Sequence, residues 1–292
     1  MPKQLLGCIC LAAAASIWGG MFVAVRIAVE YIPPVPLVWM RFLIAIFVLL
    51  GAAWYQGVSL KAARRDLPLL IAVGVIGHTI SIVTQEYGTM YSSAQMGSVI
   101  TSATPAFMLI FAAWFLKERL TARKILAIIL ATVGVIIIAG TDSVDMTKQL
   151  GALFSTIAAL TWGLMSVLLK KIPGRYSPLV VNIYAVMTAI ICLTPFNIAT
   201  VDELPWQQIL DSPAVILSVI YLGAISTSVA FLLWNKGVLL TNAAVSGLFF
   251  FFQPVVGTFL GWLMLGEQIT MSFWLGSAMI FAGVFLVTVR SE

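Results

Sequence analysis

The sequence predicts an all-α membrane protein with ten transmembrane helices, arranged as two inverted five-helix repeats with both termini in the cytoplasm. The first observation behind this prediction is composition. Of the 292 residues, 61% are apolar and only 9% are charged, whereas a soluble domain carries roughly 45–50% apolar and about 25% charged residues. The other two observations are a series of long apolar stretches and a repeat that relates the two halves. So few charges indicate that lipid is the main solvent.

Ten apolar stretches are long enough to cross a bilayer, which takes about 20 helical residues. Proline and glycine interrupt the chain between several of them. Each stretch is expected to be helical, because lipid offers backbone polar groups no other partners. The expected spans are residues 5–28, 36–54, 67–87, 94–116, 122–140, 150–170, 177–197, 214–235, 243–264 and 270–289.

The basic residues indicate the orientation. With a cytoplasmic N-terminus, 13 of the 16 Lys and Arg residues fall on the inner side, which is the bias that membrane proteins show. Arg26 and Lys148 fall outside, and Arg41 falls near the outer end of the second span, where we expect its charge to snorkel to the interface. The inner basic residues are Lys3, Lys61, Arg64, Arg65, Lys117, Arg119, Arg123, Lys124, Lys170, Lys171, Arg175, Lys236 and Arg290.

Residues 1–140 recur as residues 150–289, mostly at a fixed offset of 149 residues. Five spans per repeat is an odd number, so the second repeat enters the membrane from the opposite side. Inverted repeats are typical of secondary transporters, which bind their substrate near the midplane between the halves. The matched pairs are Pro105 with Pro254, Glu118 with Glu267, Thr121 with Thr270, Gly88 with Gly237, and Ala94 with Ala243.

Several functional classes lack the residues that they need. The net charge of +5 resides in loops, without a basic stripe interleaved with aromatics, so no nucleic acid partner is expected. Cys8, Cys10 and Cys192 lie in apolar spans and are interpreted as packing residues. A single histidine and the absence of hydrolase or phosphate-binding motifs predict no catalytic residue, no cofactor and no metal. No acidic residue falls in the central third of a span, so no carboxylate relay for protons or sodium is visible.

His78 is the first candidate for contact with a substrate. It lies in the middle of the third span, where an ionisable side chain is costly and usually faces a cavity or a partner. Two interpretations remain open: a group that hydrogen-bonds the substrate, or a neutral imidazole bonded to a neighbouring helix. Its repeat partner is Thr227, and Gly74 and Gly77 are expected to leave room beside the ring.

Trp18 and Trp162 are candidates for an aromatic wall. Both lie in the middle of a span, although tryptophan in membranes prefers the interfaces. An aromatic wall suits a planar or apolar substrate by stacking, and plain packing is the alternative.

Pro105 and Pro254 lie in the middle of the fourth and ninth spans. Each removes a backbone donor and tends to kink its helix. A moving hinge and a static kink both fit, and the occurrence of proline at the same place in both halves favours the hinge. The candidate substrate contacts beside the prolines are Thr101, Ser102 and Gln253, and the further hinge candidates are Gly88 and Gly237.

Three acidic residues near span ends have structural interpretations. Glu118 and Glu267 lie at helix ends, where we expect them to cap helices or order loops more than to bind a substrate. Glu86 lies near the outer end of the third span with Tyr87 and Tyr91. This group is a candidate outer gate, and interfacial anchoring by tyrosine is the simpler interpretation.

Three sequence features together resemble a known family. They are the early run Ser16-Ile17-Trp18-Gly19-Gly20, its echo Thr161-Trp162-Gly163, and the two Pro-x12-Glu-x2-Thr units. Over nearly the whole chain they resemble EamA-type members of the drug/metabolite transporter superfamily. That resemblance implies ten helices in two inverted repeats and export of amino acids, related metabolites or drugs. Within the superfamily, overall likeness together with His78 and Trp162 is most similar to the YddG-type aromatic amino acid exporters.

The resemblance thus implies a secondary transporter that exports small metabolites, aromatic or hydrophobic amino acids first, by alternating access across the bacterial inner membrane. Other amino acids, nucleosides, sugar-nucleotides and drugs are alternative substrates. A polytopic membrane enzyme is a distant alternative, because it would need paired catalytic groups at one depth. The expected partners are an amino-acid-like small molecule and the lipid bilayer, and a monomer is the expected state.

Overall fold

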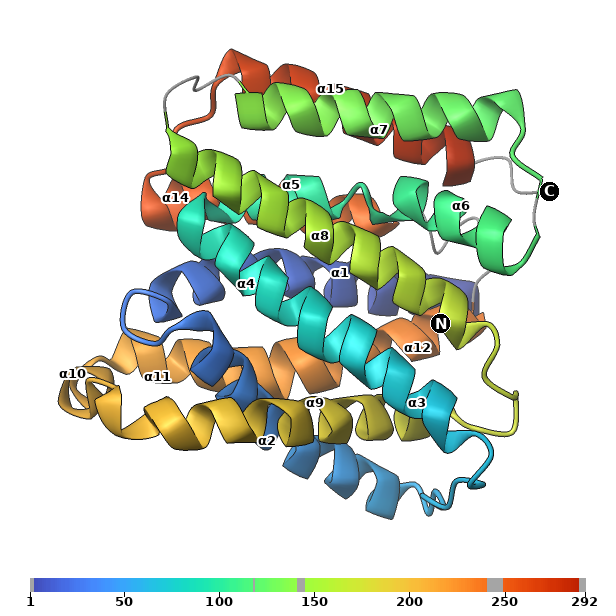
Figure 1. Cartoon of the computed structure of the whole chain (residues 1–292), viewed down its shortest axis with the longest axis vertical. Helices are drawn as coiled ribbons and strands as arrows, with labels where there is room; N and C mark the ends of the chain where they lie inside the picture. The colour runs from blue at the N-terminus through green and yellow to red at the C-terminus, as the bar shows by residue number, and fades with distance from the viewer. Residues whose placement is uncertain (1–2, 118, 141–144, 241–248, 289–292) are drawn as a thin grey trace.

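A computed structural model describes residues 3–117, 119–140, 145–240 and 249–288. These residues form ten helical rods joined by short connections (Figure 1), and four of the rods are built from more than one helical segment. The first five rods are α1 Lys3–Ala28; α2 Pro34–Tyr55; α3 Leu67–Val73 with η1 Gly74–Ser81 and α4 Ile82–Tyr91; α5 Ala94–Thr101 with α6 Thr104–Phe115; and α7 Ala122–Gly140. The second five are α8 Met146–Leu169; α9 Pro178–Thr200; α11 Pro213–Ile220 with η3 Tyr221–Val229 and α12 Ala230–Leu240; η4 Phe249–Phe251 with α14 Phe252–Leu265; and α15 Met271–Thr288. Two short helices, η2 Val201–Glu203 and α10 Trp206–Asp211, lie between α9 and α11.

The prediction of an all-α membrane fold is confirmed. In the part of the chain that the structure describes, seven rods are long and apolar enough to cross a membrane by length and composition, and α14 and α15 are shorter apolar helices. The rod ends agree with the expected spans to within a few residues. The expected start of the ninth span, residue 243, lies outside the described residues.

Local sequence sets the helix ends. Ser177 caps α9, because its hydroxyl accepts a hydrogen bond from Val180 N at 3.3 Å. Asp145 does the same for the first turn of α8. At the opposite kind of end, the repeat partners Lys117 and Gly266 both adopt a left-handed backbone, with φ of 55° and 66°. That conformation ends a helix, and only glycine adopts it without steric cost.

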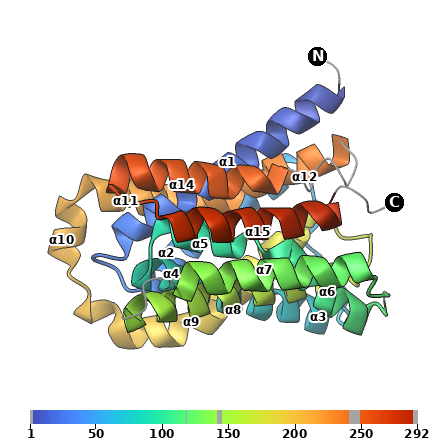
Figure 2. The same ribbon diagram turned by 90° about the horizontal axis from the view of Figure 1, so that it is seen from above.

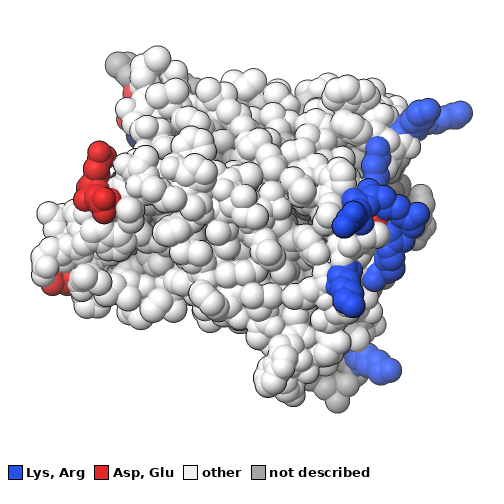
Figure 3. Space-filling view, turned by 60° about the horizontal axis from the view of Figure 1, so that its bottom comes forward, with Lys and Arg blue, Asp and Glu red and all other residues white. Residues whose placement is uncertain are grey.

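The two halves run in opposite directions through the bundle. Figure 1 shows α1, the first helix of the first half, antiparallel to α8, the first helix of the second half. Figure 3 shows Lys and Arg gathered at one end of the molecule and Asp and Glu at the other. We call the basic end the inner end and the acidic end, where α10 lies, the outer end. The inversion predicted from the odd number of spans is therefore seen in the helix directions and in the charge distribution.

The halves interlock pairwise. Rods of equal rank pack together at the two edges of the bundle: α7 lies along α15 at one edge, and α2 crosses and packs against α9 at the other (Figures 1 and 2). The α7–α15 contact is close, since a Cβ placed on Gly134 would lie 2.6 Å from the carbonyl oxygen of Gly276. Small residues allow such approach between membrane helices. Between the edges, α1 packs against α12 and α14, and α4 packs against α8.

Two irregularities recur in both halves. The π-helices η1 and η3 occupy corresponding positions of the third and eighth rods, since an offset of 149 residues carries most of η1 onto η3. The fourth rod breaks at Ser102 and Ala103, and a 3-10 turn, η4, takes the corresponding place in the ninth rod. Pro105 and Pro254 follow these two irregularities, as expected of residues that disturb a helix. Irregular backbone thus recurs at matching positions in the two halves.

Candidate functional site

His78 lies in the π-helix η1 and is 5% exposed. Its Nε2 lies 2.9 Å from Oδ1 of Asn182 on α9. Both residues line a cavity of about 290 Å³ that extends to Pro173 and Gly174, in the loop between α8 and α9 at the inner end. Of the residues that the structure describes, no Lys, Arg, Asp or Glu lines this cavity. A π-helix often marks a functional position, and here it places a histidine beside a cavity without charged walls.

This inner polar pair, His78 and Asn182, keeps one free donor and one free acceptor. Nδ1 of His78 and Nδ2 of Asn182 are both buried and have no hydrogen-bond partner. If Nε2 donates to Asn182, the free atoms are an acceptor on the ring and a donor on the amide. If the amide is turned over, the two roles exchange, so the pair still offers one of each. Buried polar atoms normally have partners, which makes this pair suited to a ligand that both donates and accepts.

Aromatic rings surround the inner polar pair. The ring centroid of His78 lies 6.0 Å from that of Trp162, 6.1 Å from Phe231 and 5.9 Å from Phe42. Phe231 also lies 5.4 Å from Trp18, whose indole Nε1 donates to the carbonyl oxygen of Ser226 at 3.1 Å. The structure therefore brings His78, Trp162 and Trp18 into one aromatic cluster, centred on Phe231. The first three residues stand out in the sequence as polar or aromatic side chains at mid-span, whereas Phe231 and Asn182 follow no spacing pattern that would single them out.

The candidates around the prolines form a separate group. Gln253 Nε2 donates to Thr101 Oγ1 at 3.3 Å and so links the ninth rod to the fourth. Thr101 and Ser102 also bond to carbonyl oxygens of their own helix. Among the described residues, no hydrogen bond or ring contact joins this group to the inner polar pair. These hydrogen bonds lie beside the helix irregularities that precede Pro105 and Pro254, and the Gln253–Thr101 bond connects the two halves at that place.

The glycine candidates lie at tight helix contacts. Gly88 lies inside α4 and faces Ser155 and the carbonyl oxygen of Gly151 on α8. Gly237 lies inside α12, and a Cβ there would lie 3.0 Å from the carbonyl oxygen of Gly7 on α1. These two contacts are equivalent by the repeat, so each glycine allows close packing of the third rod of one half on the first rod of the other.

The expected room beside His78 is taken by neighbouring helices. A Cβ on Gly74 would lie 2.6 Å from Thr188 Cβ on α9, and Gly77 faces Met165 on α8. The expectation was therefore wrong. These glycines allow α8 and α9 to pack closely against η1. The cavity lies on the side of His78 that faces Asn182 and Phe231.

The repeat partner of His78, Thr227, takes part in a different cluster. We call Arg41, Glu86, Ser226 and Thr227 the outer cluster. Arg41 Nη1 donates to Glu86 Oε1 at 2.8 Å, and Nη2 donates to Thr227 Oγ1 at 2.9 Å. Arg41 is 2% exposed and Glu86 is fully buried, so Arg41 does not snorkel as expected, and Glu86 is not an interfacial residue. The sequence does not reveal this ion pair, because the two charges lie in different spans, 45 residues apart.

Glu267 caps a helix in the opposite half. Its Oε1 and Oε2 accept from the backbone N–H groups of Ala94 and Gln95, at 2.7 and 2.9 Å. These are the first residues of α5, where a carboxylate also complements the helix dipole. The expected capping role is confirmed for Glu267, and Glu118 lies outside the described residues.

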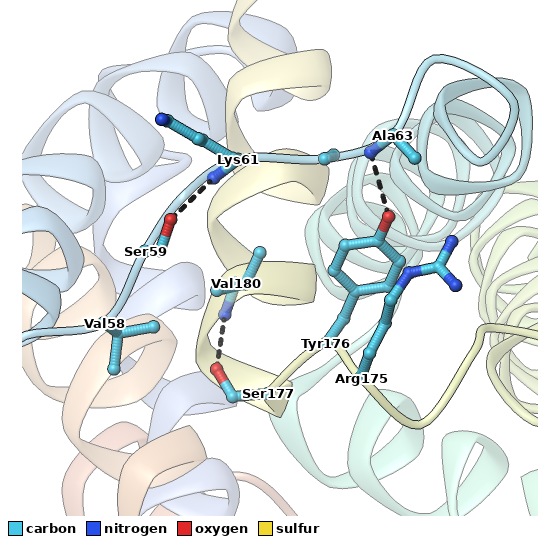
Figure 4. A pocket seen from close by; sticks show the side chains of 9 residues that line it. Val58, Ser59, Lys61, Ala63, Arg175, Tyr176, Ser177 and Val180 are labelled. Carbon is cyan, nitrogen blue, oxygen red and sulfur yellow. Dashed lines mark hydrogen bonds between the residues drawn. The ribbon is translucent and has the colours of Figure 1, made fainter.

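A second hollow opens at the inner end, between the loops that precede α3 and α9 (Figure 4). It has a volume of about 550 Å³. Beside it, Arg175 forms an ion pair with Asp66, Tyr176 donates to the same carboxylate at 2.6 Å, and Ala63 N donates to the Tyr176 hydroxyl at 3.0 Å. The Tyr176 hydroxyl lowers the pKa of Asp66, and Arg175 lowers it further. We call Asp66, Arg175 and Tyr176 the inner clamp, because they join a loop of the first half to a loop of the second.

No group of three or more His, Cys, Asp or Glu residues stands close enough to hold a metal ion within the described residues. What the geometry offers is a cavity between inverted halves, lined by the neutral polar pair, by Phe231 and Tyr176, and otherwise mostly by aliphatic side chains. Trp162 and Trp18 belong to the aromatic cluster beside the cavity and are not part of its lining. That arrangement suits recognition of a small molecule and not covalent chemistry.

Comparisons with known proteins agree with the fold. A solved crystal structure superposes with a TM-score of 0.65 over 98% of this chain and 96% of its own, at 18% identity, which shows the shared fold alone. The chain is 28% identical over 284 residues to a protein of Archaeoglobus fulgidus named uncharacterized transporter, covering 96% of this chain and 97% of that protein.

Two further relatives carry more specific names. A protein of Streptantibioticus cattleyicolor named probable terminal-alkyne amino-acid exporter is 28% identical, covering 94% of this chain and 90% of its own length. A protein of Escherichia coli named probable amino-acid metabolite efflux pump is 26% identical, covering 92% and 90%.

The sequence profile of the EamA-like transporter family matches the chain twice, at residues 5–140 and again at residues 149–289. The two matches cover nearly the whole chain and fall on the two halves that run in opposite directions through the bundle. The chain is a multi-pass membrane transporter and belongs to the EamA-like transporter family.

Proposed function

We propose that this transporter exports small zwitterionic metabolites, aromatic or hydrophobic amino acids first, across the bacterial inner membrane. The single observation that carries the proposal is the inner polar pair. His78 Nδ1 and Asn182 Nδ2 are buried and have no hydrogen-bond partner, and both residues line the cavity. An amino acid offers donors on its ammonium group and acceptors on its carboxylate, which matches one free acceptor and one free donor.

The cavity supports the same class of substrate. Its volume of about 290 Å³ is at the small end of ligand pockets, which run from roughly 300 to 1,000 Å³. Its described lining includes no cationic side chain that would hold a phosphate group, which weighs against sugar-nucleotides. Trp162 and Phe231 stand beside the polar pair, where an aromatic or aliphatic side chain would pack against them. Relatives named as amino-acid exporters point the same way.

Alternating access is the mechanism that we propose for this architecture. Residues 1–140 and 150–289 would rock against each other about the central cluster, and Pro105 and Pro254 would act as hinges beside the breaks in the fourth and ninth rods. The cavity reaches the inner end at Pro173 and Gly174, whereas the outer cluster is fully packed. That asymmetry fits an inward-facing state, from which a substrate would enter on its way out.

The test is a flux screen in proteoliposomes. The purified chain is reconstituted, and exchange of each of the twenty radiolabelled amino acids is measured, with uridine and a sugar-nucleotide alongside. We expect exchange of aromatic and large aliphatic amino acids and none of the sugar-nucleotide. If no amino acid exchanges, the proposed substrate class is wrong. If uridine alone exchanges, nucleosides and not amino acids are the substrates.

A further inference from the structure

The outer cluster holds an ion pair that transport of a zwitterion does not need. The side chains of Arg41 and Glu86 are 3% and 0% exposed, and their charged atoms are 2.8 Å apart. Burying two charges carries a large desolvation cost for each, and an apolar pair of similar volume is often as stable. Ionisable residues inside membrane helices are rare and usually carry function. The pair therefore calls for a role beyond stability.

The two partners are satisfied to different degrees. Arg41 contacts Glu86, donates to Thr227 from both Nε and Nη2, at 3.2 and 2.9 Å, and reaches Met21 Sδ at 3.3 Å. Glu86 accepts from Arg41 at Oε1, but its Oε2 is buried and has no hydrogen-bond partner. A buried carboxylate oxygen without a hydrogen-bond donor is unfavourable while it is charged. Protonation of that oxygen removes the charge and needs no further residue.

The surroundings favour a proton over a metal ion. Arg41, from α2, already places a positive charge against Glu86, which would repel a metal ion at the other oxygen. The remaining neighbouring elements add no second carboxylate. On α1, Arg26 interacts with Glu267; in η1, His78 is bonded to Asn182; α5 carries no charged residue.

Lys3, Cys8 and Cys10 of α1 and Tyr55 of α2 lie toward the inner ends of their helices, away from Glu86. The other charged or ionisable groups on the elements around Glu86 lie on α8 and on α4 itself. Tyr87 and Tyr91 of α4 stack with Phe154 of α8. Lys148 lies in the first turn of α8, at the outer end. Arg41 is therefore the group that sets the electrostatics of Glu86.

We propose that Glu86 is the proton-binding site that couples substrate export to proton entry. This inference rests on the proposed transport function and adds its energy source. Protonation forms an O–H bond at Oε2 and removes the negative charge, and nothing is oxidised or reduced. Arg41 then loses its counter-charge, while it still joins α2 of the first half to η3 of the second.

The geometry gives the coupling a direction. The ion pair with Arg41 belongs to the state in which the outer cluster is packed, so that state favours the carboxylate. In a state open to the outer side, water reaches Arg41 and weakens its ion pair with Glu86. That state therefore favours the protonated form of Glu86. Glu86 therefore takes a proton from outside in the open state, and re-formation of the pair on closure releases it on the inner side. One proton enters for each cycle that carries a substrate out.

The experiment uses the full chain in proteoliposomes, with radiolabelled phenylalanine as the probe and two assays. The first is exchange without gradients, and the second is accumulation driven by a pH gradient. We expect Glu86→Gln to keep exchange, slowed at most severalfold, and to lose pH-driven accumulation at least tenfold. The matched control is Glu203→Gln, the same change at an exposed outer carboxylate, which should keep both activities.

Each contrary outcome has a distinct meaning. If wild type exchanges phenylalanine but ignores the pH gradient, or if Glu86→Gln still accumulates it, the proton site is wrong and the transport function stands. If wild type does not exchange phenylalanine, the proposed function and this inference both fail for that substrate. If Glu86→Gln cannot be purified as a folded protein, proton movement during phenylalanine transport by wild type decides, followed with a pH-sensitive dye inside the vesicles. Phenylalanine transport that moves no protons would overturn the proton site.

Discussion

The inner polar pair and the outer cluster occupy corresponding places in the two repeats, yet their chemistry differs. In each case, the second helix of one half bonds to the π-helix of the other half: α9 to η1 through Asn182 and His78, and α2 to η3 through Arg41 and Thr227. The inner pair carries no carboxylate or guanidinium and leaves two atoms free beside a cavity. The outer cluster carries an ion pair and is packed.

The difference shows how two copies of one repeat can keep the same backbone feature and carry different chemistry. The backbone device, a π-helix held by a polar side chain from the opposite half, is kept in both places. Phe42 lies between the two sites, 5.9 Å from the His78 ring and 5.9 Å from the Arg41 guanidinium carbon. We therefore propose that the neutral side recognises the substrate and the charged side couples transport to protons. Three predictions test that division, and a fourth tests the inner clamp.

The largest effect is expected at the outer cluster. Arg41→Met would leave the Glu86 carboxylate buried without a counter-charge, which costs about 3–5 kcal/mol of stability. The double substitution Arg41→Met with Glu86→Gln removes both charges and should regain most of that loss. Thermal unfolding in detergent, followed by size-exclusion chromatography, compares wild type, the single variant and the double variant. If the single variant is as stable as the double variant, the pair does not hold the outer cluster together.

The next effect belongs to the inner polar pair. His78→Ala and Asn182→Ala should each reduce amino acid exchange at least tenfold, since a hydrogen bond worth about 1.4 kcal/mol accounts for a factor of ten. Asn197→Ala is the matched control: Asn197 is also a buried asparagine of α9, but its amide donates to the carbonyl oxygen of Leu193 away from the cavity. Wild-type exchange in both site variants would remove the inner polar pair from substrate recognition.

A smaller effect is expected from the aromatic wall. Trp162→Ala should raise the KM for phenylalanine about two- to tenfold, because an aromatic pair contributes about 0.5–1.5 kcal/mol. Trp162→Phe should restore most of the affinity, and Trp206→Phe near the outer end should change nothing. The measurement is the concentration dependence of exchange for phenylalanine and alanine. An equal rise in KM for both substrates would indicate that Trp162 only packs.

The smallest effect is expected at the inner clamp. The pKa of Asp66 is lowered from its ordinary value of 3.8. Its carboxylate is therefore ionised and accepts the Tyr176 hydrogen bond above that value, and this stabilisation is lost only as the pH falls below it. Acidification from about pH 7 to about pH 5 should therefore leave the clamp closed. Spin labels at Val58 and Gly174 report the loop separation, which should widen in Asp66→Asn at either pH. A wild-type clamp that opens between these two pH values would contradict the assignment.

The sequence by itself determined the number of rods, their ends, the inversion and the middle of the site. Apolar length decides what spans a bilayer, Lys and Arg decide orientation, and a repeat of fixed offset aligns the halves. His78, Trp18 and Trp162 were identifiable because polar and aromatic side chains at mid-depth are exceptions to those rules. The capping by Glu267 followed from its place at a helix end.

Only the tertiary structure decided which side chains meet. Asn182 reaches His78 across 104 residues, and Arg41 reaches Thr227 across 186. Such partners are brought together by packing between inverted halves, which no local period records. The buried state of Glu86 depends on the same packing, because its counter-charge comes from another span. Sequence therefore located the seam between the halves. Tertiary structure showed that its inner side holds a neutral polar pair beside a cavity, while its outer side holds a packed ion pair.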